Sequence, residues 1–166
     1  MIVAQIERGL LTVDRTDAPD YERLFREESG GLFRALFVFT GGRRDIAEDA
    51  TAEAFARAMT QERLRDPVAW IYRTAFRLAV DAHRHEHRFA AAVETTVEPP
   101  ELHDLMGALR HLSPNQRAVV LLHHLEGFTL EETATRMGIA ASTARVHLHR
   151  ARTKLRRLLG DEEPSA

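Results

Sequence analysis

The densest cluster of charge in this 166-residue chain lies near its C-terminal end. Residues 136–157 contain six arginines, one lysine and no carboxylate. Cations at this density repel one another, and the repulsion lowers stability unless an anion compensates for it. Guanidinium groups bind phosphates and guanine bases through paired hydrogen bonds. These residue types at this spacing therefore indicate that the segment binds a polyanion, and the alternative is a plain solvated helix face.

The charge of the whole chain is different. Its formal net charge is −2, which argues against a protein that coats nucleic acid along its entire surface. Positive charge is concentrated in residues 136–157 and, more weakly, in residues 73–88. Residues 89–109 hold four carboxylates and no lysine or arginine. The cations therefore mark local recognition surfaces.

The composition also limits the cellular location that we expect for the protein. The chain has no cysteine, which excludes disulfides and zinc sites built on thiolates. Its N-terminus lacks the basic and apolar regions of a signal peptide. The longest apolar runs fall far short of the roughly 20 residues that span a bilayer. We therefore expect a cytoplasmic protein without membrane insertion.

Catalytic and metal-binding patterns are not evident. The sequence shows no glycine-rich phosphate loop, nucleophile elbow or paired-carboxylate cleft, so we predict no enzymatic activity, no catalytic residue and no cofactor. His83, His85 and His87 offer ring nitrogens, but their spacing does not match HExxH and a metal would need further ligands. We predict a basic surface there and no metal site.

Helical periodicity defines a first block, residues 19–89. Apolar residues recur at helical spacing between residues 24 and 37, and a glycine pair follows that helix. A second helix is predicted from Asp45. Asp66 is predicted to cap a third helix that begins with Pro67. No segment alternates in the manner of a strand, so we predict none.

Two features interrupt this pattern. Gly30 and Gly31 lie inside the first predicted helix, where each lowers helix propensity by roughly 1 kcal/mol relative to alanine. Residues 90–107 are acidic and contain two consecutive prolines, which predicts a linker. Within that linker, the part from about Glu101 is compatible with a helix.

A second block, residues 108–160, contains two capping boxes, Ser113 with Gln116 and Thr129 with Glu132. The helix after Ser113 is predicted to stop at Gly127. The helix after Thr129 is predicted to stop at a glycine turn, and a basic helix follows. The predicted fold class is therefore all-α, with two small helical domains joined by a linker and a helix-turn-helix in the C-terminal domain.

The basic helix has two faces. Its apolar stripe recurs at spacings of four and three residues and should face inward; it consists of Ala144, Leu148, Ala151, Leu155 and Leu158. In a helix-turn-helix the N-terminal part of the second helix contacts base edges in the major groove. The residues expected to point outward or to the flank are Thr143, Arg145, His147, Arg150 and Lys154.

The second block resembles the C-terminal domain of bacterial RNA polymerase sigma factors, which reads the −35 promoter element. The residues that carry this resemblance are LSPNQRAVVLLHHLEGFTLEETATRMGIAASTARVHLHRARTKLRRLL. The first block resembles the family's other conserved domain, through AEDATAEAFARA and DPVAWIYRTAFRLAVDAHRHEHR. The presence of these two domains alone is similar to the extracytoplasmic-function class.

The resemblance implies three sets of site residues. The set expected on the −35 element is Thr129, Ser142, Thr143, Arg145, His147, His149, Arg150 and Lys154. The set expected on the −10 element is Tyr72, Arg73, Arg77, Arg84 and Arg88, with Tyr72 a better surface candidate than Trp70. The set expected on polymerase is Glu48, Asp49, Glu53 and Phe55.

The resemblance also implies partners. These are promoter DNA, an anti-sigma factor, and core RNA polymerase through its β′ clamp helices and β flap. The chain departs from the family pattern at Ala52, at Phe76-Arg77 and at His147. Those departures leave open a DNA-binding regulator that no longer docks on polymerase. A third alternative is a module that competes for an anti-sigma factor without contacting DNA.

Overall fold

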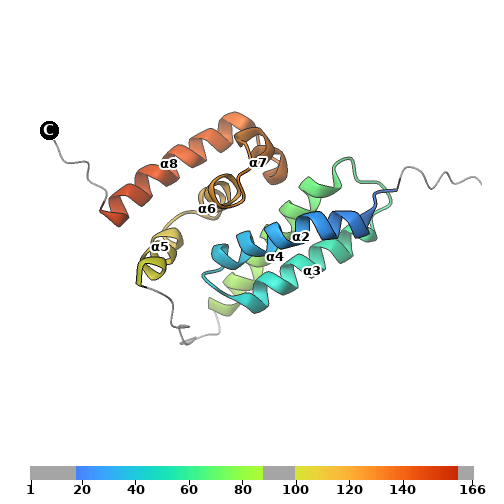
Figure 1. Cartoon of the computed structure of the whole chain (residues 1–166), viewed down its shortest axis with the longest axis horizontal. Coiled ribbons are helices and arrows are strands. Elements are labelled where there is room, and N and C mark those ends of the chain that lie inside the picture. Colours follow the sequence, from blue (N-terminus) through green and yellow to red (C-terminus); the bar gives the residue numbers. More distant parts are fainter. Residues whose placement is uncertain (1–17, 88–99, 161–166) are drawn as a thin grey trace, which may run out of the picture.

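The computed structural model describes residues 18–87 and 100–160, and helices joined by short turns make up both segments (Figure 1). No strand occurs in either described segment, so the predicted all-α class is confirmed. The first unit contains α2 (Tyr21–Phe39), α3 (Arg44–Met59) and α4 (Pro67–His87). The second contains α5 (Pro100–Arg110), α6 (Pro114–Val120), the π-helical turn η2 (Leu121–Leu125), α7 (Leu130–Met137) and α8 (Ala141–Leu159).

The first unit is built around α3, which packs along both α2 and α4. Small side chains make this close approach possible, because Ala47, Ala54 and Ala58 of α3 are fully buried. The predicted cap of the third helix is confirmed: Asp66 accepts a 2.9 Å hydrogen bond from the main-chain N–H of Ala69.

The helix α2 runs without interruption through Gly30 and Gly31. At Gly31, the missing side chain allows a close contact with the second unit. A Cβ atom at Gly31 would lie 2.7 Å from an oxygen of the Glu126 carboxylate, which is closer than real Cβ contacts. Gly31 therefore weakens the helix locally but provides room for the second unit to approach it.

The predicted linker is too long at its C-terminal end. The helix α5 begins at Pro100, inside residues 90–107. Proline is compatible with the first turn of a helix, because that turn needs no main-chain N–H donor. Pro100 is therefore the first residue of a helix, which agrees with the helix that the sequence allowed from about Glu101. Residues 90–99 of the predicted linker lie outside the described residues.

Local signals in the sequence determine where α6 and α7 begin. Both capping boxes are present, at Ser113 with Gln116 and at Thr129 with Glu132. Gly138 ends α7 in the left-handed region, with φ of 67°. The helix α8 then packs against α5, α6 and α7 through its predicted stripe. Its buried members are Ala144, Leu148 and Ala151, whereas Leu158 is 42% exposed.

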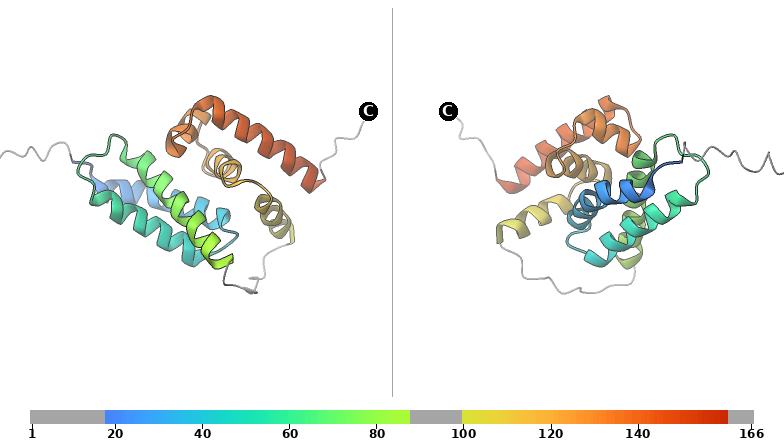
Figure 2. Two further views of the ribbon diagram at one scale, coloured as in Figure 1. Left: turned by 180° about the vertical axis from the view of Figure 1, so that it is seen from behind. Right: turned by 45° about the vertical axis from the view of Figure 1, so that its right-hand side comes forward.

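The two units lie against each other and share one continuous apolar core. The helices α6 and η2 lie against α2, and α7 lies against α4. The helix α8 lies on the side of the second unit that faces away from α2, α3 and α4 (Figure 2). The fold therefore places α4 at the interface between the units and α8 at the outer surface.

Candidate nucleic-acid interface

The outer face of α8 is the most cationic surface of the second unit. Of the residues predicted to contact the −35 element, five on α8 are exposed: Ser142, Thr143, Arg145, His149 and Arg150. The helix starts after Ala140, which provides no side-chain cap. The first amides of α8 therefore stay available to an anion such as a phosphate.

Four cationic or polar side chains form a line along α8. Arg145, His149, Arg152 and Arg156 follow one another at spacings of four, three and four residues, and all are exposed. Together with Leu130 they line a shallow groove of about 250 Å³ beside α7. No carboxylate pairs with these arginines within the described parts of the chain. Arg152 and Arg156 were not among the predicted site residues, although their spacing from Arg145 was a usable signal.

One arginine of the cationic segment, which we predicted to bind a polyanion as a whole, turns inward. The guanidinium of Arg136 lies 3.7 Å from the centre of the Phe128 ring and 5.3 Å from that of Tyr72. One of its nitrogens lies 3.9 Å from a carboxylate oxygen of Glu28. The reason is its place in the last turn of α7, which faces α4 and not the solvent. Arg136 is therefore a contact between the two units.

Two other predicted −35 residues are only half-exposed. The Nζ atom of Lys154 donates a hydrogen bond to the main-chain carbonyl of His111, at the end of α5. The Nδ1 atom of His147 is buried and forms no hydrogen bond with any residue of the two described segments. Lys154 therefore joins α8 to α5, and the flank of α8 is partly structural.

Thr129 is exposed, but its polar groups already take part in a capping box. Its hydroxyl accepts a 3.1 Å bond from the N–H of Glu132, and its own N–H donates to the Glu132 carboxylate at 2.8 Å. Hydrogen bonds to the Glu132 carboxylate, first from the main-chain N–H of Thr129 and then from its side chain, hold the pKa of Glu132 below its ordinary value. The Thr129 hydroxyl is therefore engaged by the cap of its own helix.

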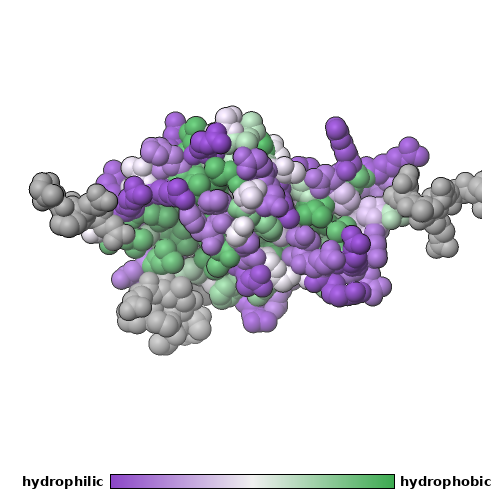
Figure 3. Space-filling view, turned by 45° about the horizontal axis from the view of Figure 1, so that its top comes forward, coloured by the Kyte–Doolittle hydropathy of each residue, from purple (hydrophilic) through white to green (hydrophobic). Residues whose placement is uncertain are grey.

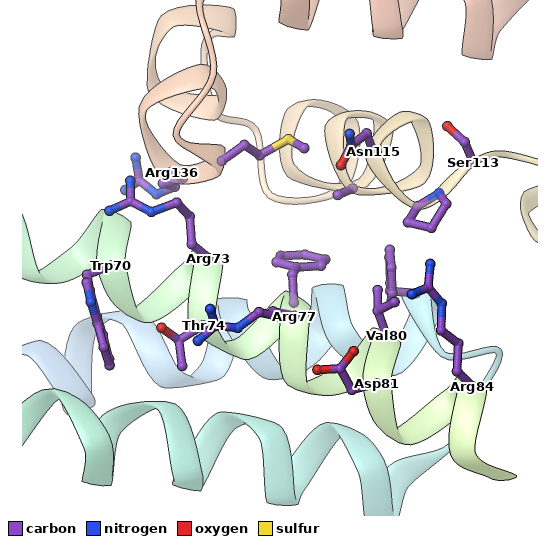
Figure 4. A pocket seen from close by; sticks show the side chains of 15 residues that line it. Trp70, Arg73, Thr74, Arg77, Val80, Asp81, Arg84, Ser113, Asn115 and Arg136 are labelled. Carbon is purple, nitrogen blue, oxygen red and sulfur yellow. The ribbon is translucent and has the colours of Figure 1, made fainter.

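Three of the predicted −10 residues lie beside a cavity of about 700 Å³ between α4 and the second unit (Figure 4). Arg73, Arg77 and Arg84 are exposed residues of α4 and line this cavity. In Figure 4, Arg73 and Arg84 extend from α4 toward α7 and α6 respectively. Arg73 and Arg84 therefore extend toward the second unit, whereas Arg77 lies along α4 beside Thr74 (Figure 4). Arg88 lies outside the described residues.

The prediction that Tyr72 is a surface residue is wrong. Its side chain is 1% exposed, and its hydroxyl donates a 3.0 Å bond to the Glu28 carboxylate. Burial, together with the Glu28 charge, raises the pKa of the Tyr72 hydroxyl. Tyr72 lies one helical turn before the fully buried Ala75, so it shares the packing face of α4. Trp70 is half-buried and lines the cavity, so of Trp70 and Tyr72 it is Trp70 that lies nearer the surface.

The predicted polymerase-binding residues also include both exposed and buried side chains. Glu48, Asp49 and Glu53 are exposed on α3. Phe55, in contrast, is 4% exposed and packs edge-on against Phe25, with 5.0 Å between ring centres. The prediction that Phe55 lies on a docking surface is therefore wrong, because it belongs to the core between α2 and α3.

Two apolar residues close to Phe55 are exposed at the surface instead. Phe25 is 50% exposed and Met59 is 65% exposed. Met59 follows Phe55 by one helical turn, so it lies on the same side of α3. This end of the first unit therefore presents an apolar patch. The carboxylates of Glu48, Asp49 and Glu53 lie farther toward the start of α3, where Arg44 pairs with Glu48 and Arg57 pairs with Glu53.

Two other features bear on function. No three histidine, cysteine or carboxylate side chains cluster as a metal site among the described side chains, which do not include that of His87. None of the helices in the described segments combines the length and the apolar character that a bilayer span requires. The side of the molecule that includes α8 presents hydrophilic residues with apolar patches between them (Figure 3).

This geometry agrees with comparisons to known proteins. The Sigma-70, region 4 family matches residues 102–155, which include the helix-turn-helix. The RNA polymerase sigma factor CarQ of Myxococcus xanthus is 30% identical, over 86% of this chain and 91% of that protein. The chain belongs to the RNA polymerase sigma factors of the ECF class.

Other members of this sigma-factor family differ in length. The ECF RNA polymerase sigma factor SigE of Mycolicibacterium smegmatis is 28% identical over 87% of this chain, which spans 63% of that protein. A solved structure of the sigma factor RpoE in complex with the anti-sigma factor NepR from Bartonella quintana superposes with a TM-score of 0.66. It is 21% identical and covers 88% of this chain and all of that one, which supports the two-unit helical fold.

Proposed function

We propose that this chain binds core RNA polymerase and directs it to promoters whose −35 and −10 elements it recognises. The observation that carries this proposal is the line of exposed arginines on α8, which no carboxylate of the described segments neutralises. Arg145 and Arg150 lie in the N-terminal half of α8, where a recognition helix contacts bases. Arg152 and Arg156 would contact phosphates farther along the groove.

The first unit would bind polymerase and the −10 element. Phe25 and Met59 supply an apolar contact, and the exposed carboxylates of Glu48, Asp49 and Glu53 follow along α3, two of them paired with arginines of the same helix. Such a surface suits a basic partner helix, here the β′ clamp helices. Once the interface between the units opens, Arg73, Arg77 and Arg84 would hold separated DNA strands by their backbone, and Trp70 would stack on a base.

Further partners follow from the same reasoning. Leu125 and Leu158 are 46% and 42% exposed, and they offer the second unit an apolar contact for the β flap. The structural neighbour RpoE is in complex with an anti-sigma factor. We infer a partner of that kind here. The chain would act in the cytoplasm as a recognition subunit, and the polymerase would supply all catalysis. The functional units would be residues 19–89 and 108–160.

Co-purification with core polymerase tests docking and separates this proposal from a regulator that only binds DNA. Tagged wild-type chain should retain core polymerase on a column. The double variant Glu48→Lys with Asp49→Lys should lose it, because it reverses the charge of the α3 surface. The matched control, Glu62→Lys with Asp104→Lys, changes the same charge at exposed positions outside α3 and should retain the polymerase. Failure of the wild-type chain to retain polymerase would support the regulator.

A further inference from the structure

We infer that Val146 is a specificity-determining residue of this sigma factor, whose side chain contacts the C5 methyl group of a thymine in the −35 element. The inference rests on the proposed function, because it names a chemical feature of the DNA that α8 reads. Three observations carry it: the direction in which Val146 points, its exposure, and the polar residues around it.

Val146 lies at the centre of the outer face of α8. This helix buries Ala144, Leu148 and Ala151 against the rest of the second unit. With about 3.6 residues per turn, position 146 is almost diametrically opposite the mean direction of those three. Val146 is 47% exposed, and it lies within the first two turns of a helix that begins at Ala141. In a helix-turn-helix, this part of the second helix enters the major groove.

The neighbours of Val146 on this face are polar. Ser142, Thr143, His149 and Arg150 lie three or four positions away, where helix geometry places them next to it, and all four are exposed. Isolated apolar residues are common on protein surfaces and need no explanation by themselves. This valine differs because it occupies the side of α8 farthest from the protein core. Helix stability does not explain its presence, because valine is a weaker helix former than alanine.

A protein partner does not match this position. Docking surfaces contain contiguous apolar patches, but Val146 is the one exposed large apolar side chain among residues 141–157, all of which the structure describes. The next ones, Leu158 and Leu159, lie about three helical turns farther along α8. Arg145 and Arg150 flank Val146 with positive charge, which favours a polyanion.

The major groove offers an apolar partner for this side chain. Base edges present hydrogen-bond donors and acceptors there, and thymine adds the C5 methyl group, which cytosine lacks. The two methyl groups of Val146 form no hydrogen bonds, so their favourable contact in the groove is with this methyl group. Arg150 lies one turn after Val146 on the same side of α8 and can donate to a guanine close by. Arg152 and Arg156, on the flank of α8, would hold the DNA backbone and fix the register of the contact.

The test removes the methyl group from the DNA. The whole wild-type chain selects a preferred duplex from a randomised pool, and each thymine of that duplex is then replaced singly by deoxyuridine, which lacks only the C5 methyl group. Fluorescence anisotropy at constant salt measures Kd. At one thymine we expect the replacement to raise the wild-type Kd about fourfold, as burial of about one methyl group implies. Val146→Ala should bind the thymine and uridine duplexes equally well.

Thr143→Ser is the matched control. It also removes a methyl group from an exposed β-branched residue of α8, but at a position beside the centre of the outer face. This variant should keep the fourfold difference between thymine and uridine. Val146→Ala should fold normally, since alanine is the stronger helix former at an exposed helical position. Loss of the difference in that variant therefore reports the contact itself.

Equal sensitivity to uridine in wild type and Val146→Ala would overturn the inference. Loss of the sensitivity in Thr143→Ser alone would also overturn it, because another residue would then read the methyl group. A selected site at which no thymine is sensitive to uridine would overturn the role of Val146 but leave −35 recognition intact. A pool that yields no preferred sequence would contradict the proposed function itself, so the two failures are distinguishable.

Discussion

Arg117 donates a 2.8 Å hydrogen bond to the main-chain carbonyl of Phe39, across 78 positions of sequence and across the boundary between the two units. The same guanidinium also donates to three carbonyls around the turn between α5 and α6, those of Leu109, Arg110 and Leu112. It lies 5.1 Å from the centre of the Phe39 ring. The Arg117 side chain therefore donates hydrogen bonds to the free main-chain carbonyls at the C-terminal end of α5 and joins α5 to the end of α2.

Arg117→Ala should lower the free energy of unfolding by about 2–4 kcal/mol, because the four carbonyls lose a charged donor in a largely buried site. Arg117→Lys should restore only part of the loss, since an ammonium cannot reach all four acceptors. Urea unfolding measures the effect. The control Arg63→Ala, at an exposed position, should stay within about 0.5 kcal/mol of wild type. An equally small effect for Arg117→Ala would show that these hydrogen bonds do not stabilise the fold.

Two glycines should respond to alanine in opposite directions. Gly138 has φ of 67° and lies against Arg73, so Gly138→Ala should destabilise the protein by about 1–2 kcal/mol. Gly107 lies inside α5, and a Cβ atom there would meet nothing within 4 Å. Gly107→Ala should therefore stabilise the protein by about 0.5–1 kcal/mol. Thermal unfolding of both variants tests the turn geometry, and effects of the same sign would contradict it.

The line of arginines on α8 predicts how salt affects DNA binding. Arg152→Ala and Arg156→Ala should each weaken binding of all duplexes about equally and reduce the slope of log Kd against log salt by about 1, as expected for phosphate contacts. Arg145→Ala should also relax sequence preference, at a cost of about 1–3 kcal/mol for the preferred site. Arg65→Ala, outside the second unit, is the control. If Arg65→Ala changes the slope as much as Arg152→Ala, α8 is not the duplex surface.

His124 predicts a pH dependence of stability. Burial, followed by the charges of Arg152 and His123, lowers the pKa of His124 below its ordinary value of 6.5. Its Nε2 atom accepts bonds from Arg152 at 3.1 and 3.3 Å, which requires that this atom be unprotonated. Above pH 6.5 the ring is neutral in the folded and unfolded states. Below it, the unfolded state binds the proton more readily, so stability falls as the pH decreases.

The comparison for this prediction is His124→Gln, which does not titrate. Between about pH 7.5 and about pH 5.5, the melting temperature of the wild type should fall by more than that of the variant. Histidines away from position 124 contribute equally to both proteins, so the difference reports His124 together with its neighbour His123. Parallel melting curves over this range would show that His124 does not couple to folding.

Local features of this fold were predictable from sequence, because their causes are local. Both capping boxes, the Asp66 cap and the Gly138 turn depend on residues within four positions of one another. The face of α4 that packs against the core could not be predicted in the same way. Its packing face is carried by small residues, Ala75 and Ala79, on the side of Tyr72. An interpretation weighted toward large apolar residues therefore placed Trp70 inside and Tyr72 outside.

The contacts between the two units also could not be predicted from the sequence. The Arg34–Glu126 pair spans 92 positions, and nothing local distinguishes these residues from other charges on helices. The inward turn of Arg136 has the same cause, since it depends on Glu28 and Tyr72 of the other unit. A partial signal existed only for Arg117, a single cation beside the apolar run Ala118–Leu122. Such an isolated cation needs acceptors nearby.

The central proposal is that this chain gives core polymerase its promoter specificity through α8. Run-off transcription with core enzyme on genomic fragments tests it most directly, with wild type compared against the double variant Arg145→Ala with Arg150→Ala. Wild type should yield transcripts from discrete start sites, and the double variant should lose them while still co-purifying with polymerase. Absence of discrete transcripts with the wild-type chain, or equal transcripts with the double variant, would contradict the proposal.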